Sequence, residues 1–147
     1  MNDTAKRSPR EMLGHVLLPV AHEDDALATA IALEPYRPDG VTALHVVEKA
    51  GGAPDKTPVE QSERIASAAF DAVRMVFPEA DDRTAYGRDV IDEILEAAEA
   101  VDASAIAYRP RDGNRLARFL SGDLSLRMIT RADRPVVVLP DPKDGAE

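Results

Sequence analysis

The sequence predicts an α/β domain built as a three-layer sandwich, with a five-stranded parallel sheet covered by helices on both faces. Five short strand-like segments, most of them apolar, alternate along the chain with four segments whose apolar residues recur at helical spacing. Strict alternation of strands and helices requires crossover connections, which are right-handed and place helices on both faces of a parallel sheet. The length of 147 residues fits one domain of ordinary size.

The strands are predicted at the short runs of apolar and β-branched residues. The segment 82–86 is polar and is therefore predicted at an edge of the sheet. The segment 135–139 (PVVVL) is continuously apolar, which predicts burial on both of its faces. In chain order, the predicted strands are residues 15–20, 41–47, 82–86, 104–108 and 135–139.

The helices are predicted from their first turns and their apolar stripes. The acidic run 23–25 suits a helix N-terminus, where carboxylate oxygens meet free backbone N–H groups and the dipole favours negative charge. Thr57 is followed by Pro58 and Glu60, a strong start signal. The predicted helices are residues 23–35 (through Leu27, Ile31 and Leu33), 57–76 (Ile65, Ala69, Ala72, Val73, Val76), 91–101 (Ile91, Ile94, Leu95, Ala98, Val101) and 123–131 (Leu124 and Met128 facing in).

Composition excludes several classes of protein. The chain has no cysteine, which excludes disulfide frameworks, Cys-based zinc sites and thiol catalysis. Its apolar runs fall well short of the roughly 20 residues that span a bilayer, and residues 1–13 lack the apolar core of a signal peptide. We therefore expect a cytoplasmic protein without membrane insertion.

The charge balance is strongly acidic, with 27 Asp and Glu against 18 Lys and Arg, a formal charge of −9. General nucleic-acid binding needs a basic footprint, so we expect none. Only four of the 18 basic residues are lysine, and alanine is abundant. This composition favours a halophilic protein that stays hydrated in concentrated salt, and an ordinary acidic protein from a GC-rich genome is the alternative interpretation.

The three histidines differ in their position relative to the predicted strands. His15 and His45 fall at or within predicted strands, which favours structural roles. His22 directly follows the first strand and precedes the acidic run 23–25, so a hard-metal or acid/base site is one interpretation. Capping of the first helix explains the same acids more simply. The sequence has no metal-spaced histidine pair and no Ser-His-Asp order, so we predict neither a metal site nor an enzyme.

From residue 15 to residue 140 the chain resembles a universal stress protein. LLPV followed by an alanine-rich helix resembles the family's first strand and helix, and ALHVV resembles its second strand. The most specific segment is SAIAYRPRDGNRLARFLSGDLSLRMITRADRPVVVLP, which resembles the family's fourth strand, glycine-marked loop, basic-apolar helix and final strand. The resemblance implies strand order 3-2-1-4-5, a switch point between strands one and four, and a dimer often paired through the final strand.

The resemblance also implies a test for bound nucleotide. Members that bind ATP carry a loop of Gly, two residues, Gly, nine residues, then Gly with Ser or Thr, and an Asp at the end of strand one. Glycines let backbone N–H groups approach phosphates, and the helix that follows favours anions. Of these positions this chain retains Gly122 alone; the others carry Ala21, Arg109, Asp112 and Asp123.

Arginines are concentrated around this loop. Residues 109–134 hold seven arginines and three aspartates, a formal charge of +4, while the other residues sum to −13. Arginine binds phosphate bidentately, so the cluster could hold a small anionic ligand or an acidic partner. The alternative is that these arginines pair with the protein's own carboxylates or solvate helix faces.

The functional prediction is a homodimeric, non-enzymatic universal stress protein with a degenerate nucleotide site, acting as a stress-linked regulatory or partner-binding module with a regulatory protein as its candidate partner. Binding of ATP or AMP through the arginine-rich loop is the alternative, and Tyr108 either stacks on a ligand base or fills an empty pocket. We expect tails at residues 1–14 and 141–147 around a domain at 15–140. The candidate ligand-binding residues are Pro19, Ala21, His22, Val46, Tyr108, Arg109, Arg111, Asp112, Gly113, Asn114, Arg115, Gly122, Asp123, Leu124 and Ser125.

Overall fold

A computed structural model describes residues 11–48, 56–109 and 122–140. Its five strands form one parallel sheet in the order β3-β2-β1-β4-β5, which confirms the predicted fold class and strand order. The polar strand β3 lies at one edge, as predicted, and β5 lies at the other. The strands are β1 (Val16–Pro19), β2 (Val41–Glu48), β3 (Asp81–Gly87), β4 (Ala105–Tyr108) and β5 (Val136–Val138).

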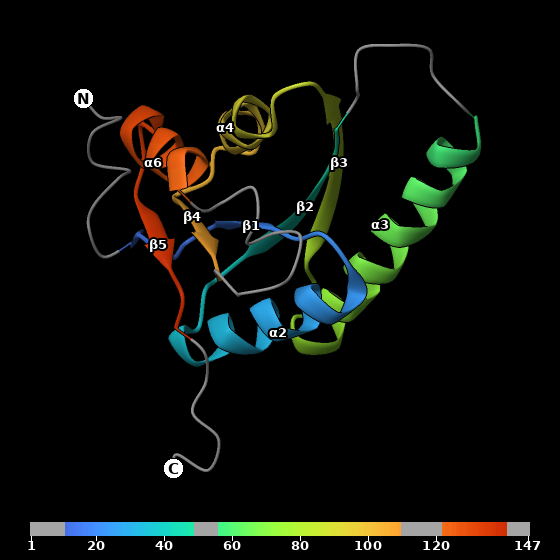
Figure 1. The fold of residues 1–147 in the computed structure, drawn as a ribbon. Coiled ribbons are helices and arrows are strands. Elements are labelled where there is room, and N and C mark those ends of the chain that lie inside the picture. Colours follow the sequence, from blue (N-terminus) through green and yellow to red (C-terminus); the bar gives the residue numbers. More distant parts are fainter. Residues whose placement is uncertain (1–10, 49–55, 110–121, 141–147) are drawn as a thin grey trace.

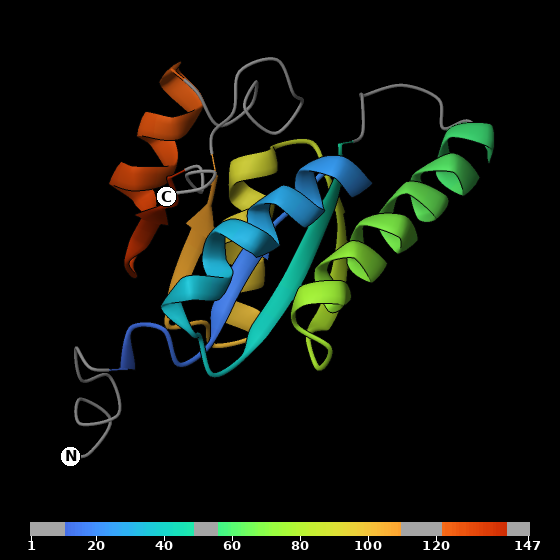
Figure 2. The same ribbon diagram turned by 90° about the horizontal axis from the view of Figure 1, so that it is seen from below.

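Within the described ranges, two helices cover each face of the sheet. Helices α2 (Glu23–Leu33) and α3 (Lys56–Val76) lie on one face, and α4 (Val90–Ala100) and α6 (Gly122–Arg131) lie on the other. The view turned by 90° shows α2 and α3 side by side across their face (Figure 2). Because side chains alternate along a strand, β1 sends Leu18 toward the first pair and Leu17 toward the second.

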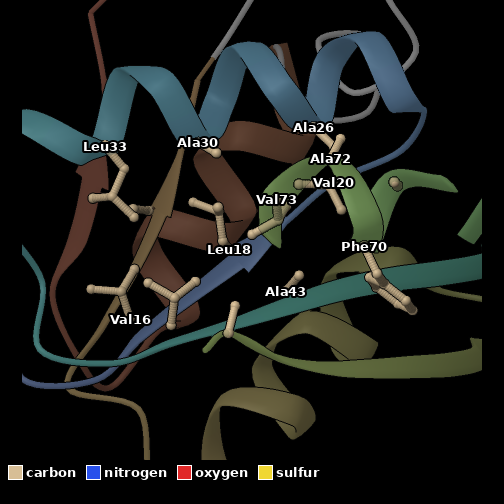
Figure 3. Packing of buried hydrophobic residues seen from close by; sticks show 14 of the residues in the cluster. Val16, Leu18, Val20, Ala26, Ala30, Leu33, Ala43, Phe70, Ala72 and Val73 are labelled. Atoms are coloured by element: carbon tan, nitrogen blue, oxygen red, sulfur yellow. The ribbon is translucent and has the colours of Figure 1, made fainter. Parts of the chain in front are cut away.

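The core beneath α2 and α3 is built largely from small side chains. Ala26, Ala30 and Leu33 of α2 point toward the sheet, and Leu18 of β1 lies beneath Ala30 (Figure 3). The alanines have little volume, which lets α2 approach the sheet closely. The predicted stripe of α3 is confirmed by its burial: Ala69, Ala72 and Val73 are buried, and Ile65 and Val76 are partly buried.

The second core is more aliphatic. Ile91 and Ile94 of α4 pack with Leu17 of β1, Ile106 of β4 and Met128 of α6, and all five side chains have no exposed area. The inward orientation predicted for Met128 is confirmed. Burial of such side chains contributes about 1.5–3 kcal/mol each, so this layer is a major source of stability.

Several element boundaries differ from the predicted ones by a few residues. Helix α2 ends at Leu33 and continues as a single 3-10 turn, Glu34–Tyr36, because Pro35 removes a backbone N–H donor. Helix α3 begins at Lys56, one residue before the predicted start. Ile31, placed among the apolar residues of α2, is 44% exposed and does not belong to the core.

The prediction that the last strand is buried on both faces is wrong. Strand β5 has only three residues, and Val138 is 51% exposed, while Val136 and Val137 are partly buried. The reason is position: β5 pairs with β4 alone and forms an edge of the sheet. Among the described residues, no helix is both long and apolar enough to cross a membrane.

Candidate functional site

The carboxyl ends of β1 and β4 meet where the strand order reverses. Strand β1 pairs with β2 on one side and with β4 on the other, all in parallel. In sheets of this kind, ligands bind outside the carboxyl ends of the strands at such a switch point. Pro19 is the last residue of β1 and Tyr108 the last of β4. Arg109 directly follows β4, Ala21 comes two residues after β1, and both are buried.

The carboxylate of Asp25 occupies the end of β1. Asp25 lies in the first turn of α2, only 4% exposed, and its Oδ2 accepts hydrogen bonds from the amides of Ala21 (2.7 Å) and His22 (3.1 Å). The capping interpretation of the acidic run is thereby confirmed for this residue. Oδ1 of the same carboxylate is buried and has no hydrogen-bond partner among the described residues.

Burial is the main influence on the charge of Asp25. It raises the pKa of this carboxyl above the ordinary value, while the two amide hydrogen bonds and then the charges of His22 and Arg109 act in the opposite direction. The alternation of β4 explains why Arg109 is close: Ala107 faces α2 and α3, Tyr108 faces the other layer, and the next residue returns to the α2 side. A buried guanidinium, 6% exposed, therefore lies near a buried carboxylate.

Tyr108 belongs to the core rather than to an open surface. It is 2% exposed and lies in the same cluster as Ala21, Leu44 and Met128. Val46 is partly buried and packs against this cluster from β2. The packing gives Tyr108 a space-filling role beneath the crevice in this structure.

His22 precedes the first turn of α2 and is half-buried. His22, Glu23 and Asp24 form one wall of a groove of about 470 Å³, and four residues of α3 form the other: Gln61, Arg64, Ile65 and Ala68. Among the described residues, no group of three His, Asp or Glu side chains is arranged to hold a metal ion. Glu23 and Asp24 thus line this groove, whereas Asp25 is turned toward the end of β1.

The structural interpretation of the other two histidines is confirmed. His45 of β2 is buried and donates from Nδ1 to the carbonyl of Val20 at 3.3 Å. Burial lowers the pKa of this imidazole. His15 Nε2 is hydrogen-bonded to Thr42 Oγ1 at 2.7 Å.

Three arginines of the predicted cluster pair with the protein's own carboxylates. Arg127 on α6 contacts Asp89 at 2.6 Å, and Arg131 pairs with Asp92 of α4. Arg134 is 8% exposed and binds four partners: the carbonyls of Ala98 and Ala103 and the carboxylates of Glu99 and Asp133. For these three residues the self-pairing interpretation is confirmed, and they fasten α6 and the start of β5 to α4.

The remaining candidates lie around the β4–α6 connection. Gly122, Asp123, Leu124 and Ser125 form the first turn of α6, one residue earlier than the predicted helix start. The candidates outside the described residues are Arg111, Asp112, Gly113, Asn114 and Arg115.

Sequence reasoning treated Asp25 as a capping residue and did not include it among the crevice residues. Its place four residues after Ala21 was a usable signal, because a carboxylate in the third position of a helix can reach back to the preceding backbone amides. Its proximity to Arg109, which comes 84 residues later in the sequence, required the strand order to be known.

Solved structures with the same fold come from bacteria and archaea. The universal stress protein UspA from Lactobacillus plantarum is 22% identical over 86% of this chain and 97% of its own, with a TM-score of 0.62. A universal stress protein from Archaeoglobus fulgidus in complex with dAMP is 20% identical over 84% of this chain and 95% of its own, with a TM-score of 0.59. A protein of the universal stress protein family from Burkholderia pseudomallei is 18% identical over 88% and 97%, with a TM-score of 0.61.

A comparison with curated protein sequences gives no significant match. At these identities the solved structures establish the fold alone. The family model described as the universal stress protein family matches residues 12–140, which is most of the chain. The chain therefore belongs to the universal stress protein family.

Proposed function

We propose that this protein is a non-enzymatic, cytoplasmic regulatory module of the universal stress protein family, whose nucleotide site is degenerate and which acts by binding a protein partner. The observation that carries the proposal is the buried pair of charges at the switch point. Asp25 follows β1 and Arg109 follows β4; they are 4% and 6% exposed, and the charge of Arg109 acts on the carboxyl of Asp25. A ligand entering there would have to displace or rearrange this pair.

The sequence at the same place supports the proposal. The end of β1 carries Ala21, which offers no side-chain group for a nucleoside. Arg109 stands where the resemblance puts a glycine, so a long side chain fills space that a close backbone approach would need. Asp112 and Asp123 stand at two further motif positions, and their charge disfavours phosphate.

Nucleotide binding by the whole chain tests this proposal. We expect titration calorimetry with ATP or AMP to give no saturable heat for the wild type, at the salt concentration of greatest stability. The double variant Ala21→Asp, Arg109→Gly restores two motif positions, and a gain of binding there would localise the defect to the strand ends. Stoichiometric ATP or AMP released from the purified, denatured wild type would contradict the proposal.

Adenine-nucleotide binding through the arginine-rich loop is the second candidate. Structures of family members in complex with dAMP and with cAMP favour it, as does the location of Arg109 at the switch point. This candidate predicts saturable binding that Arg109→Ala or Arg111→Ala abolishes and that Arg83→Ala, on the exposed edge strand β3, leaves unchanged. No detectable heat at millimolar nucleotide would reject it.

We further propose that the protein is a homodimer paired through the final strand. Strand β5 is the last strand on its side of the sheet among the described residues, and Val138 on it is 51% exposed. Leu126 and Ile129 on α6, the helix leading into β5, are also exposed large apolar residues. Val138→Lys should convert the dimer to a monomer in light scattering, whereas Met75→Lys, an equally drastic change at an exposed site on α3, should not. A wild type that is monomeric at all concentrations would refute the dimer.

A further inference from the structure

The groove between the first turn of α2 and α3 is not used by the proposed function. Its volume of about 470 Å³ exceeds that of an amino-acid-sized molecule. Its lining comes from α2 and α3, the two helices that lie side by side in Figure 2. Two separate elements build it. The α2 wall comes from three consecutive residues at the helix start, and the α3 wall from residues spaced three and four apart, which fall on one side of that helix.

The two walls carry opposite charge. Glu23 and Asp24 stand on the α2 side, and Arg64 stands with Gln61 on the α3 side. Although all four residues line one groove, no ion pair joins Arg64 to either carboxylate within the described chain. The groove is therefore wide enough at this point to keep the charges apart. Between them, Ile65 and Ala68 supply an apolar surface.

The carboxylates of this wall take no part in the hydrogen bonds that join α2 to β1. Asp25 makes these bonds, through Oδ2, to the amides of Ala21 and His22 immediately before the helix. The carboxylates of Glu23 and Asp24 make no hydrogen bond within the part of the chain that the structure describes. Their carboxylates are thus available to a cation in the groove, while Asp25 is not.

We infer that this groove binds a small linear zwitterion, an ω-amino acid whose ammonium group faces Glu23 and Asp24 and whose carboxylate faces Arg64 and Gln61. The aliphatic chain of such a molecule would lie on Ile65 and Ala68. Separated walls require separated charges, which favours an ω-amino acid over a compact α-amino acid. A phosphorylated ligand is disfavoured because two carboxylates oppose a single arginine.

The test is a titration of the uniformly 15N-labelled protein with 6-aminohexanoate, followed in amide NMR spectra. We expect saturable shifts confined to the first turn of α2 and to the α3 residues that line the groove. Hexylamine and hexanoate each retain one of the two charges, and we expect both to bind more weakly, by a factor of up to about five, the upper end for losing one ion pair at an exposed site.

Charge variants then assign each end of the ligand. The pair Glu23→Gln, Asp24→Asn should weaken 6-aminohexanoate and hexylamine but not hexanoate, and Arg64→Met should weaken 6-aminohexanoate and hexanoate but not hexylamine. The double variant Glu79→Gln, Glu96→Gln and the single variant Arg88→Gln change the net charge by the same amounts at exposed positions outside the groove, and should leave all three titrations unchanged.

Shifts that do not saturate would overturn the inference, as would control variants that weaken binding as much as the groove variants do. Native amide dispersion in every variant, in one common buffer, shows that each is folded. Because the groove and the switch point share no test variant, failure here leaves the proposed function untouched.

Discussion

The carboxylate of Asp25 accepts a hydrogen bond from the backbone amide of Ala21 across 2.7 Å, which fastens the start of α2 to the end of β1. The same oxygen also accepts from the amide of His22. Two donors that a parallel sheet ordinarily leaves free at its carboxyl edge are thus satisfied from within the chain. A change at Asp25 should therefore alter both the stability of the domain and the charge beside its crevice.

Two substitutions of Asp25 distinguish the contribution of its hydrogen bonds from that of its charge. Asp25→Ala removes both amide bonds from a buried site, and we expect a loss of about 2 kcal/mol in the free energy of unfolding. Asp25→Asn keeps an oxygen that can accept from Ala21, so a smaller loss is expected. Urea denaturation of the two variants measures the difference, and equal stability of Asp25→Ala and wild type would contradict the role given to these bonds.

The raised pKa of Asp25 predicts that the stability of the protein depends on pH. Burial raises the pKa of Asp25 in the folded state above 3.8, so the folded protein holds this proton more tightly than the unfolded chain. The stabilising contribution of this proton is then fully present below about pH 3.8 and is lost as the pH rises through the raised pKa. The stability of wild type minus that of Asp25→Asn should therefore fall with rising pH across this window. A stability difference that rises with pH would show that the pKa of Asp25 is lowered, not raised, in the folded protein.

Asp89 combines a helix cap with an ion pair. Its Oδ1 accepts from the amides of Ile91 and Asp92, and its Oδ2 pairs with Arg127, which lowers the pKa of Asp89. Asp89→Ser keeps a capping oxygen and loses the charge; this pair is partly exposed, so we expect a cost below about 1 kcal/mol. Asp89→Ala loses the cap as well, about 1–2 kcal/mol in total.

Chemical denaturation of the Ser and Ala variants resolves the cap from the pair. Because the pKa of Asp89 is lowered in the folded protein, its charge stabilises the fold above about pH 3.8. This contribution is lost as the pH falls through the lowered pKa. Identical stabilities for Asp89→Ser and Asp89→Ala would show that the cap contributes nothing.

Buried Arg134 joins the end of α4 to the segment that leads into β5. Its Nη1 donates to the carbonyls of Ala98 and Ala103 at 2.9 and 2.7 Å, and Arg134→Met leaves both buried acceptors without it. We expect a loss of about 2–4 kcal/mol, consistent with removal of one partner from a buried polar network. Thermal unfolding measures it, and Arg131→Met, an exposed arginine on the same side, should cost well under half as much.

The acidic composition predicts dependence on salt. With a formal charge of −9, self-repulsion destabilises the fold at low ionic strength, and screening relieves it. The halophilic interpretation predicts that the melting temperature rises steeply with KCl and continues to rise at molar concentrations. Full stability without added salt would refute that interpretation and leave the protein an ordinary acidic one.

The order of elements was readable from the sequence because each depends on local periodicity. The alternation of apolar runs and helical stripes is a property of neighbouring residues, and it predicted the parallel sheet, the edge position of β3 and the inward face of α3. The exposure of Val138 was not readable, because a valine run looks the same in a central strand and in an edge strand such as β5.

The contents of the crevice depended on the tertiary structure. The pairing of β1 with β4 brings Arg109 near Asp25, and the packing of α6 on α4 gives Arg127, Arg131 and Arg134 carboxylate partners from distant parts of the chain. Charge interactions act through space over a few ångströms, whereas sequence patterns report only on residues that are neighbours along the chain. The sequence by itself therefore determined the scaffold through its local pattern, and the location of the switch point through its resemblance to a family, and only the tertiary structure decided which charges meet there.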